Sequence, residues 1–148
     1  MDRVRIAALY ILFVGALIFF QNCGNSDEET AQERTLRILT SKTWTVSSVN
    51  VPINTATESS DWENFTVSFT QTDMTAANHP TGAQAVWPSG KYTISSDGSS
   101  ITRQGDEVVM VLNPISDTNF TAIFTIPPGT HVGGKIAALD GEYTFNMK

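Results

Sequence analysis

From Thr43 to the C-terminus, the chain consists of short stretches in which apolar and polar residues alternate, separated by turn residues about every 8–12 positions. The clearest stretch is 65–70, where two phenylalanines and a valine alternate with threonine and serine. Successive side chains of a strand point to opposite faces, so this pattern predicts strands with one buried and one solvated face. Short strands at this spacing are typical of an antiparallel sandwich or barrel.

We expect about eight strands and no long helix in this region. Asp97-Gly98 is a turn pair typical of β-hairpins, and Pro114 is expected to end a strand because proline lacks the backbone N–H. Short connections favour an up-and-down meander, which can close into a barrel without exposed edges. An open sandwich is the main alternative. The expected elements are a short helix over Glu33–Ser41 and strands over 44–51 (with a bulge at Ser47-Ser48), 65–70, a poorer strand that begins at 73–75, and strands over 91–94, 100–103, 107–112, 120–126 and 143–147.

The N-terminus has a different composition. Residues 1–5 carry two arginines, and the fifteen residues 6–20 contain no charge and almost only apolar side chains. A basic segment followed by an apolar run of about 7–15 residues is the layout of a secretory signal peptide. A helix that crosses a bilayer needs about 20 apolar residues. We therefore expect a signal peptide over residues 1–22, with a retained, tilted signal anchor as the alternative.

Cys23 is the only cysteine, so the chain cannot form a disulfide with itself. Its position after the apolar run resembles the bacterial lipoprotein signal, and the tract Ser26-Asp27-Glu28-Glu29 resembles the surface-export tag of lipoproteins from Bacteroidetes-type bacteria. The resemblance implies that Cys23 becomes the lipidated first residue of the mature protein. It also implies a location in the cell envelope, anchored to the outer membrane, with the acidic tract pointing to the cell surface.

Three regions follow from these features: a signal peptide over 1–22, an acidic flexible tether over 23–32 and a barrel domain over 33–148. Cleavage before Cys23 would remove Asp2, Arg3 and Arg5 from a chain with 9 basic and 15 acidic residues, so seven basic and fourteen acidic residues would remain. Nucleic acid is therefore not an expected partner, since its binding requires clustered positive charge.

The order and spacing of several motifs resemble the small lipocalin-like lipoproteins of Bacteroidetes-type bacteria. The resemblance covers most of Leu39–Met147 and implies a β-barrel of about eight strands, without implying a particular activity. Lys42-Thr43-Trp44 stands where lipocalins carry a Gly-x-Trp signature. The motifs that carry the resemblance are Leu39–Trp44, Trp62–Thr70, Val86–Gly90, Ile101–Arg103 and Asp140–Phe145.

Catalysis is not expected from this sequence. The single cysteine is predicted to be lipidated, and His79 and His131 both lie in expected loops without a carboxylate spaced to orient them. No motif for a cofactor or a metal is present, and Gly133-Gly134-Lys135 lacks the rest of a phosphate loop. The chain is therefore expected to be neither an enzyme nor a cofactor-binding protein.

Aromatic residues are the best candidates for binding. Trp44 is expected in the core, where a tryptophan on the first strand closes one end of a small barrel. Trp62, Trp87, Tyr92 and Phe69 are candidate ligand-binding residues, since aromatic side chains line apolar cavities and stack on sugar rings. Two functions remain open: a barrel that binds a small hydrophobic or amphiphilic ligand, or a non-catalytic surface or periplasmic module that binds a protein or a glycan.

Overall fold

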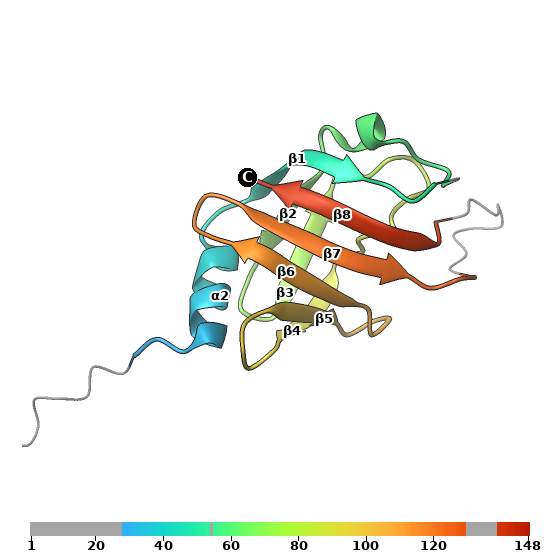
Figure 1. Ribbon diagram of the computed structural model, residues 1–148. Coiled ribbons are helices and arrows are strands. Elements are labelled where there is room, and N and C mark those ends of the chain that lie inside the picture. Colours follow the sequence, from blue (N-terminus) through green and yellow to red (C-terminus); the bar gives the residue numbers. More distant parts are fainter. Residues whose placement is uncertain (1–27, 54, 130–138) are drawn as a thin grey trace, which may run out of the picture.

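The computed structural model describes residues 28–53, 55–129 and 139–148, which form a closed antiparallel barrel of eight strands (Figure 1). The strands follow one another around the barrel in chain order, so the expected up-and-down barrel is confirmed and the open sandwich is excluded. The predicted signal peptide, Cys23 and His131 lie outside the described residues. The strands are β1 (Trp44–Asn50), β2 (Thr66–Phe69), β3 (Asp73–Ala77), β4 (Gly90–Ile94), β5 (Ser100–Arg103), β6 (Val109–Ile115), β7 (Phe120–Ile126) and β8 (Gly141–Met147).

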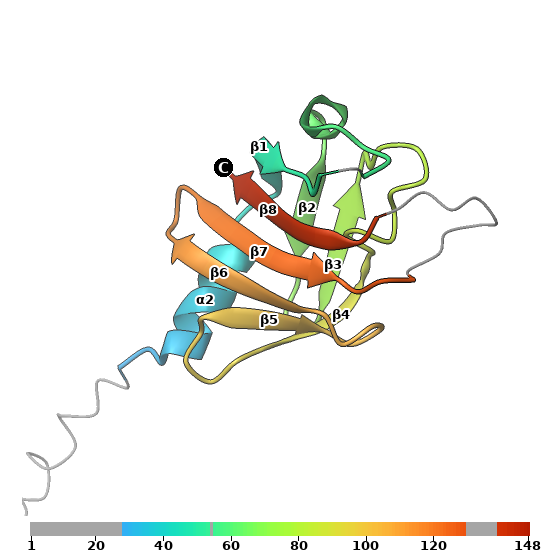
Figure 2. The same cartoon turned by 45° about the vertical axis from the view of Figure 1, so that its right-hand side comes forward.

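The barrel closes through β1, which pairs with β2 on one side and β8 on the other (Figure 2). Its first residues, Trp44 and Thr45, pair with β2, whereas Val46–Asn50 pairs with β8. The register with β8 shifts between Val46 and Ser48, at the bulge expected from the sequence. A bulge bends and twists its strand, which allows one short strand to close the ring.

Strand β6 continues beyond the expected stop at Pro114, and this part of the prediction was wrong. The strand runs to Ile115, and its register with β7 shifts between Leu112 and Ile115. Proline lacks the ladder N–H, and irregular positions are where a sheet tolerates it. The irregularity absorbs Pro114, and pairing resumes at Ile115↔Phe120.

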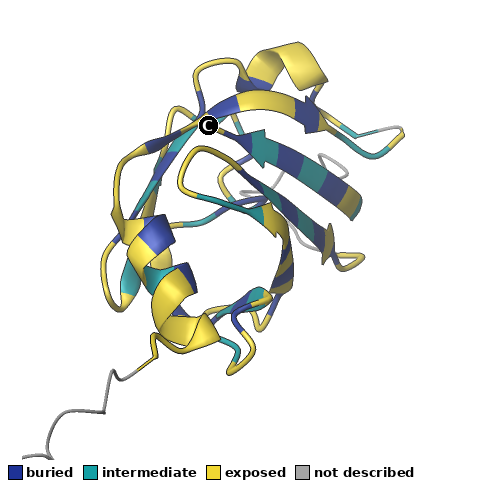
Figure 3. Cartoon of the chain, turned by 60° about the vertical axis from the view of Figure 1, so that its left-hand side comes forward, coloured by how far each residue is buried: buried dark blue, intermediate teal, exposed yellow. Residues whose placement is uncertain are grey.

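Helix α2 (Ala31–Thr40) begins two residues before the expected helix and takes in the end of the expected tether. Thr30 caps it: its hydroxyl accepts from the Glu33 N–H at 3.1 Å, and the Glu33 carboxylate accepts from the Thr30 N–H at 2.8 Å. This capping box satisfies two backbone donors that a helix leaves unpaired at its start. One face of α2 is buried and contacts β2 and β4 at one end of the barrel (Figure 3).

The interior of the barrel is filled by its own side chains. Near α2, Trp44 is fully buried as expected, and its Nε1 donates to the Leu39 carbonyl at 2.9 Å. Near the opposite end, Trp62 at the close of a short 3-10 helix η1 (Ser59–Trp62) packs among Phe65, Tyr143 and Phe145. Both ends of the barrel axis are therefore occupied by tryptophan.

Candidate functional site

Trp62 and Trp87 lie inside the molecule, and both are fully buried. Each packs edge-on against Phe145, with ring centroids 4.9 Å and 5.1 Å apart respectively. The Trp62 Nε1 donates to the Thr57 hydroxyl at 3.4 Å, whereas the Trp87 Nε1 has no hydrogen-bond partner among the described residues. Neither tryptophan forms part of an exposed aromatic surface.

Phe69 and Tyr92, the other two candidates, meet at the α2 end with ring centroids 5.5 Å apart. The Tyr92 hydroxyl donates to the Thr70 carbonyl at 2.6 Å. Burial, with a smaller contribution from the Asp73 charge, raises the pKa of Tyr92 to about 12. The structure thus separates the four candidates into two pairs at opposite ends of the barrel. Of the four, Tyr92 lines one of the two wall cavities described below, the one next to α2.

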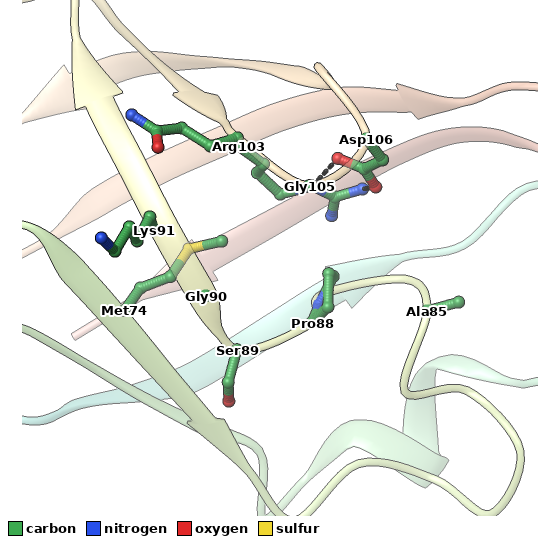
Figure 4. Close-up of a pocket in the computed structure, with 10 residues that line it drawn as sticks. Met74, Ala85, Pro88, Ser89, Gly90, Lys91, Arg103, Gly105 and Asp106 are labelled. Atoms are coloured by element: carbon green, nitrogen blue, oxygen red, sulfur yellow. Dashed lines mark hydrogen bonds and ion pairs between the residues drawn. The ribbon is translucent and has the colours of Figure 1, made fainter.

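A cavity of about 580 Å³ lies in the wall of the barrel, between β3, β4 and the β5–β6 turn (Figure 4). We call it the mouth cavity. Its lining comes from β3, the segment before β4, the start of β4, the end of β5 and the β5–β6 turn. The residues are Met74, Ala85, Pro88, Ser89, Gly90, Lys91, Arg103, Gln104, Gly105 and Asp106.

Arg103 is the buried charge of the mouth cavity, with 1 % of its surface exposed. Its Nε donates to the Asp106 carboxylate at 3.0 Å, its Nη2 forms an ion pair with the same carboxylate, and its Nη1 donates to the Val86 carbonyl at 2.6 Å. A buried charge is stable only when it is paired and hydrogen-bonded. Arg103 therefore ties the β5–β6 turn to the segment before β4, and its donors are committed to the protein.

Lys91 is the cation of the mouth cavity that remains available. Its side chain is exposed and forms no ion pair among the described residues. Arg103 and Lys91 lie on neighbouring strands, but Arg103 points into the barrel and Lys91 points outward, as their burial shows. The mouth cavity thus joins an apolar floor at Met74 and Pro88 to a polar rim at Lys91.

A second cavity, of about 510 Å³, lies between α2, the β2–β3 turn and β4, and we call it the seam groove. It exists because the β3–β4 ladder is short, with register pairs at Asp73↔Lys91 and Met74↔Gly90. Further along β3, the Ser89 hydroxyl replaces a strand partner by accepting from the Ala76 N–H at 2.9 Å. The seam groove is lined by Gln32, Glu33, Leu36, Gln71, Thr72, Asp73, Lys91, Tyr92, Thr93, Ile94 and Gln104.

The mouth cavity was not expected from the sequence, and none of Trp62, Trp87, Tyr92 and Phe69 lines it. One signal could have revealed it. Arg103 follows Ile101 by two positions and so shares its inward face, which places a charge at a core position. A charged residue at an inward position of a strand must have a dedicated partner, and here that partner is Asp106.

His79 is half-buried, and its Nε2 lies 2.7 Å from the Trp87 carbonyl oxygen. Within residues 28–53, 55–129 and 139–148, no group of three His, Cys, Asp or Glu side chains is placed to hold a metal ion. Over the same ranges, no helix has the length and apolar character needed to cross a membrane.

The fold and the two wall cavities define the class of the protein as an all-β, lipocalin-like barrel. Comparison with models of protein families finds no matching family, and comparison with curated proteins finds no significant match.

Proposed function

We propose that this protein is a lipid-anchored, lipocalin-like lipoprotein of the bacterial cell envelope that binds a small amphiphilic ligand without catalysis. The mouth cavity is the observation that carries the proposal. Its volume of about 580 Å³ falls within the range of about 300–1,000 Å³ typical of small-molecule sites. Met74, Ala85 and Pro88 offer an apolar surface for a hydrocarbon chain, and Lys91 and Gln104 offer polar contacts at the rim.

The filled interior decides where such a ligand would lie. Lipid-binding barrels of this size often hold a ligand along the axis, but Trp44, Trp62 and Trp87 occupy that space here. An axial ligand could bind only if these side chains were displaced. Emptying the space of one large aromatic side chain lowers the free energy of unfolding by about 3–5 kcal/mol. We therefore assign the ligand to the barrel wall.

The anchor rests on the sequence features around Cys23. If Cys23 is lipidated, seven residue steps separate it from the helix cap at Thr30. A fully extended chain spans at most about 3.6 Å per residue, so the start of α2 would lie within about 25 Å of the bilayer surface. Cleaved lipoproteins carry more than one acyl chain, and two chains suffice for stable anchoring.

The alternative function, a module that binds a protein or a glycan, depended on exposed tryptophans. Trp62 and Trp87 are buried, so no specific observation favours that function over ligand binding. The exposed apolar residues Val109 and Val111 of β6 lie on the outer face of the barrel, and nothing in the structure indicates what would cover them.

Native mass spectrometry of the protein purified from its own host tests the proposal. We expect a co-purifying amphiphile in the wild type and its loss in Ala85→Trp, where the larger side chain fills the mouth cavity. Thr125→Trp is the matched control, because Thr125 is exposed on β7 and lines neither cavity. A ligand that persists in Ala85→Trp, or a wild type that repeatedly carries none, would contradict the assignment.

A further inference from the structure

The mouth cavity and the seam groove are neighbours. Lys91 and Gln104 line both, so these two side chains stand at the boundary between them. A ligand that fills one cavity therefore meets the other at Lys91 and Gln104. A molecule with two chemically different ends can occupy both cavities at once.

The seam groove differs from the mouth cavity in chemistry, because most of its polar groups are uncharged amides and hydroxyls. Gln71 and Thr93 form no side-chain hydrogen bond among the described residues, and the Gln32 amide uses only its N–H, which donates to the Ile94 carbonyl at 3.0 Å. Amides and hydroxyls both donate and accept hydrogen bonds. They therefore match a ligand rich in hydroxyl groups, because each hydroxyl also donates and accepts hydrogen bonds.

The charges of the seam groove disfavour an anionic group. Two carboxylates, Glu33 and Asp73, face one ammonium, Lys91. The Glu33 Oε2 accepts from the Thr30 N–H, and the Asp73 Oδ2 accepts from the Thr72 hydroxyl at 2.6 Å. A phosphate placed here would be repelled by two charges and attracted by one. A neutral head group avoids that repulsion.

The groove also has apolar surface and lies near the predicted anchor. Tyr92, Ile94 and Leu36 supply carbon surface against which the C–H face of a sugar ring can pack. Gln32 and Glu33 belong to the first turn of α2, nine and ten residues after Cys23 in the sequence. A lipid of the anchoring membrane is therefore within reach of the groove.

We propose that the ligand is a neutral glycolipid, whose sugar head occupies the seam groove and whose acyl chain occupies the mouth cavity. This inference rests on the proposed function, since it requires that the mouth cavity binds a hydrocarbon chain. It adds the class of the head group and a site for that head group. Lys91 and Gln104 would contact the linkage between the two ends.

The test uses the full lipoprotein in phosphatidylcholine vesicles, with a diazirine in the acyl chain of a guest lipid. Three guests share the same chains: a glucosyl diacylglycerol, a phosphatidylglycerol and a phosphatidylcholine. The readout is the yield of light-induced cross-links to the mouth cavity, mapped by mass spectrometry. The double variant Gln71→Ala/Thr93→Val removes two hydrogen-bonding side chains, and Thr102→Val, opposite Thr93 on β5 and outside both cavities, is the control.

We expect the glucosyl lipid to give the highest yield. The double variant should weaken its cross-linking about tenfold, as expected for two neutral hydrogen bonds, and Thr102→Val should leave it unchanged. Equal yields for the three guests, or a glucosyl yield unaffected by the double variant, would overturn the glycolipid inference while leaving amphiphile binding intact. Absence of saturable cross-linking at the mouth cavity with any guest would overturn both proposals.

Discussion

Arg103 and Asp106 show how a single ion pair can hold two separate segments of the barrel together. The guanidinium is buried, whereas the Asp106 side chain remains 39 % exposed. Asp106→Ala would leave the guanidinium with the Val86 carbonyl as its remaining hydrogen-bond partner and with the Phe124 ring 5.5 Å away. Removing one partner of a buried pair costs about 3–5 kcal/mol, and we expect about 2 kcal/mol here because water can reach the vacated site.

Urea unfolding of the purified barrel measures this difference in free energy. The control is Asp117→Ala, since Asp117 pairs with Arg37 at 3.3 Å between two exposed side chains and surface pairs contribute at most about 1 kcal/mol. The double variant Arg103→Met/Asp106→Ala should recover part of the loss, because it removes the unpaired charge. Equal losses in Asp106→Ala and Asp117→Ala would contradict the structural role of Arg103.

The buried tyrosines Tyr92 and Tyr143 allow a direct comparison of how a hydrogen bond to a buried hydroxyl affects the free energy of unfolding. The Tyr92 hydroxyl donates to Thr70, whereas the buried Tyr143 hydroxyl makes no hydrogen bond of good geometry among the described residues and has only a weak contact with the Thr57 side chain. A buried polar group without a partner costs about 1–3 kcal/mol, and a satisfied one contributes about 1 kcal/mol. We expect Tyr143→Phe to raise the free energy of unfolding by about 1 kcal/mol and Tyr92→Phe to lower it by about as much. Thermal unfolding that shifts in the same direction for both would disagree with this structure.

Alkaline pH should destabilise the barrel through the same two side chains. Burial is the main cause that raises the pKa of Tyr92 and of Tyr143 to about 12, against about 10 in an unfolded chain. Between these values the unfolded state has lost protons that the folded state retains, so stability is complete below pH 10 and falls as the pH rises towards 12. Urea midpoints measured from pH 9 to 12 should fall less steeply in Tyr143→Phe; parallel curves would argue against a raised pKa.

At the scale of elements, α2 is held against the β4–β5 turn by a close approach at Gly98. The Thr35 hydroxyl donates to the Gly98 carbonyl at 2.9 Å. A Cβ at Gly98 would lie 2.5 Å from the Ala31 carbonyl oxygen, and the residue has a φ of +68°. The Asp97-Gly98 turn expected from the sequence thus has a second purpose, since only glycine leaves room for the helix.

Gly98→Ala should therefore destabilise the barrel more than its backbone angle alone requires. Gly82→Ala is the control, because Gly82 has a φ of +82° and no atom within 4 Å of an added Cβ. A non-glycine residue in the left-handed region costs about 1–2 kcal/mol. We expect that cost alone for Gly82→Ala and at least about 1 kcal/mol more for Gly98→Ala, measured by thermal unfolding. Similar losses at the two sites would exclude the close contact with α2.

The boundaries of the elements show which structural features can be predicted from local sequence patterns. The bulge at Ser47-Ser48 was readable because a break in alternation is a local event, and the start of α2 was missed although Thr30 and Glu33 carry the spacing of a capping box. Pro114 does not end β6, for a different reason. Whether a strand ends at a proline depends on the partner strand, and β7 resumes pairing beyond it.

At the scale of the whole molecule, the proposed anchor determines where the barrel works. Cys23→Ala should prevent lipidation, and we expect the variant to leave the membrane fraction after cell breakage and alkaline washing. Immunoblotting of the washed membranes and the supernatant measures the partition, with the wild type as the membrane-bound reference. A variant that stays in the washed membranes would instead support an uncleaved signal anchor over residues 1–22.

The all-β class of the fold follows from local features of the sequence. Alternation of side chains and hairpin turns are properties of neighbouring residues, so the strands and the preference for an up-and-down order could be predicted. Local patterns did not decide between a closed barrel and an open sandwich, or show that β6 continues past Pro114. The contents of the barrel interior could not be predicted in the same way. The burial of Trp62 and Trp87 and the position of the cavities in the wall depend on how side chains from distant strands share one interior volume. No local pattern contains that information, because the position of each core side chain depends on the side chains of all the other strands.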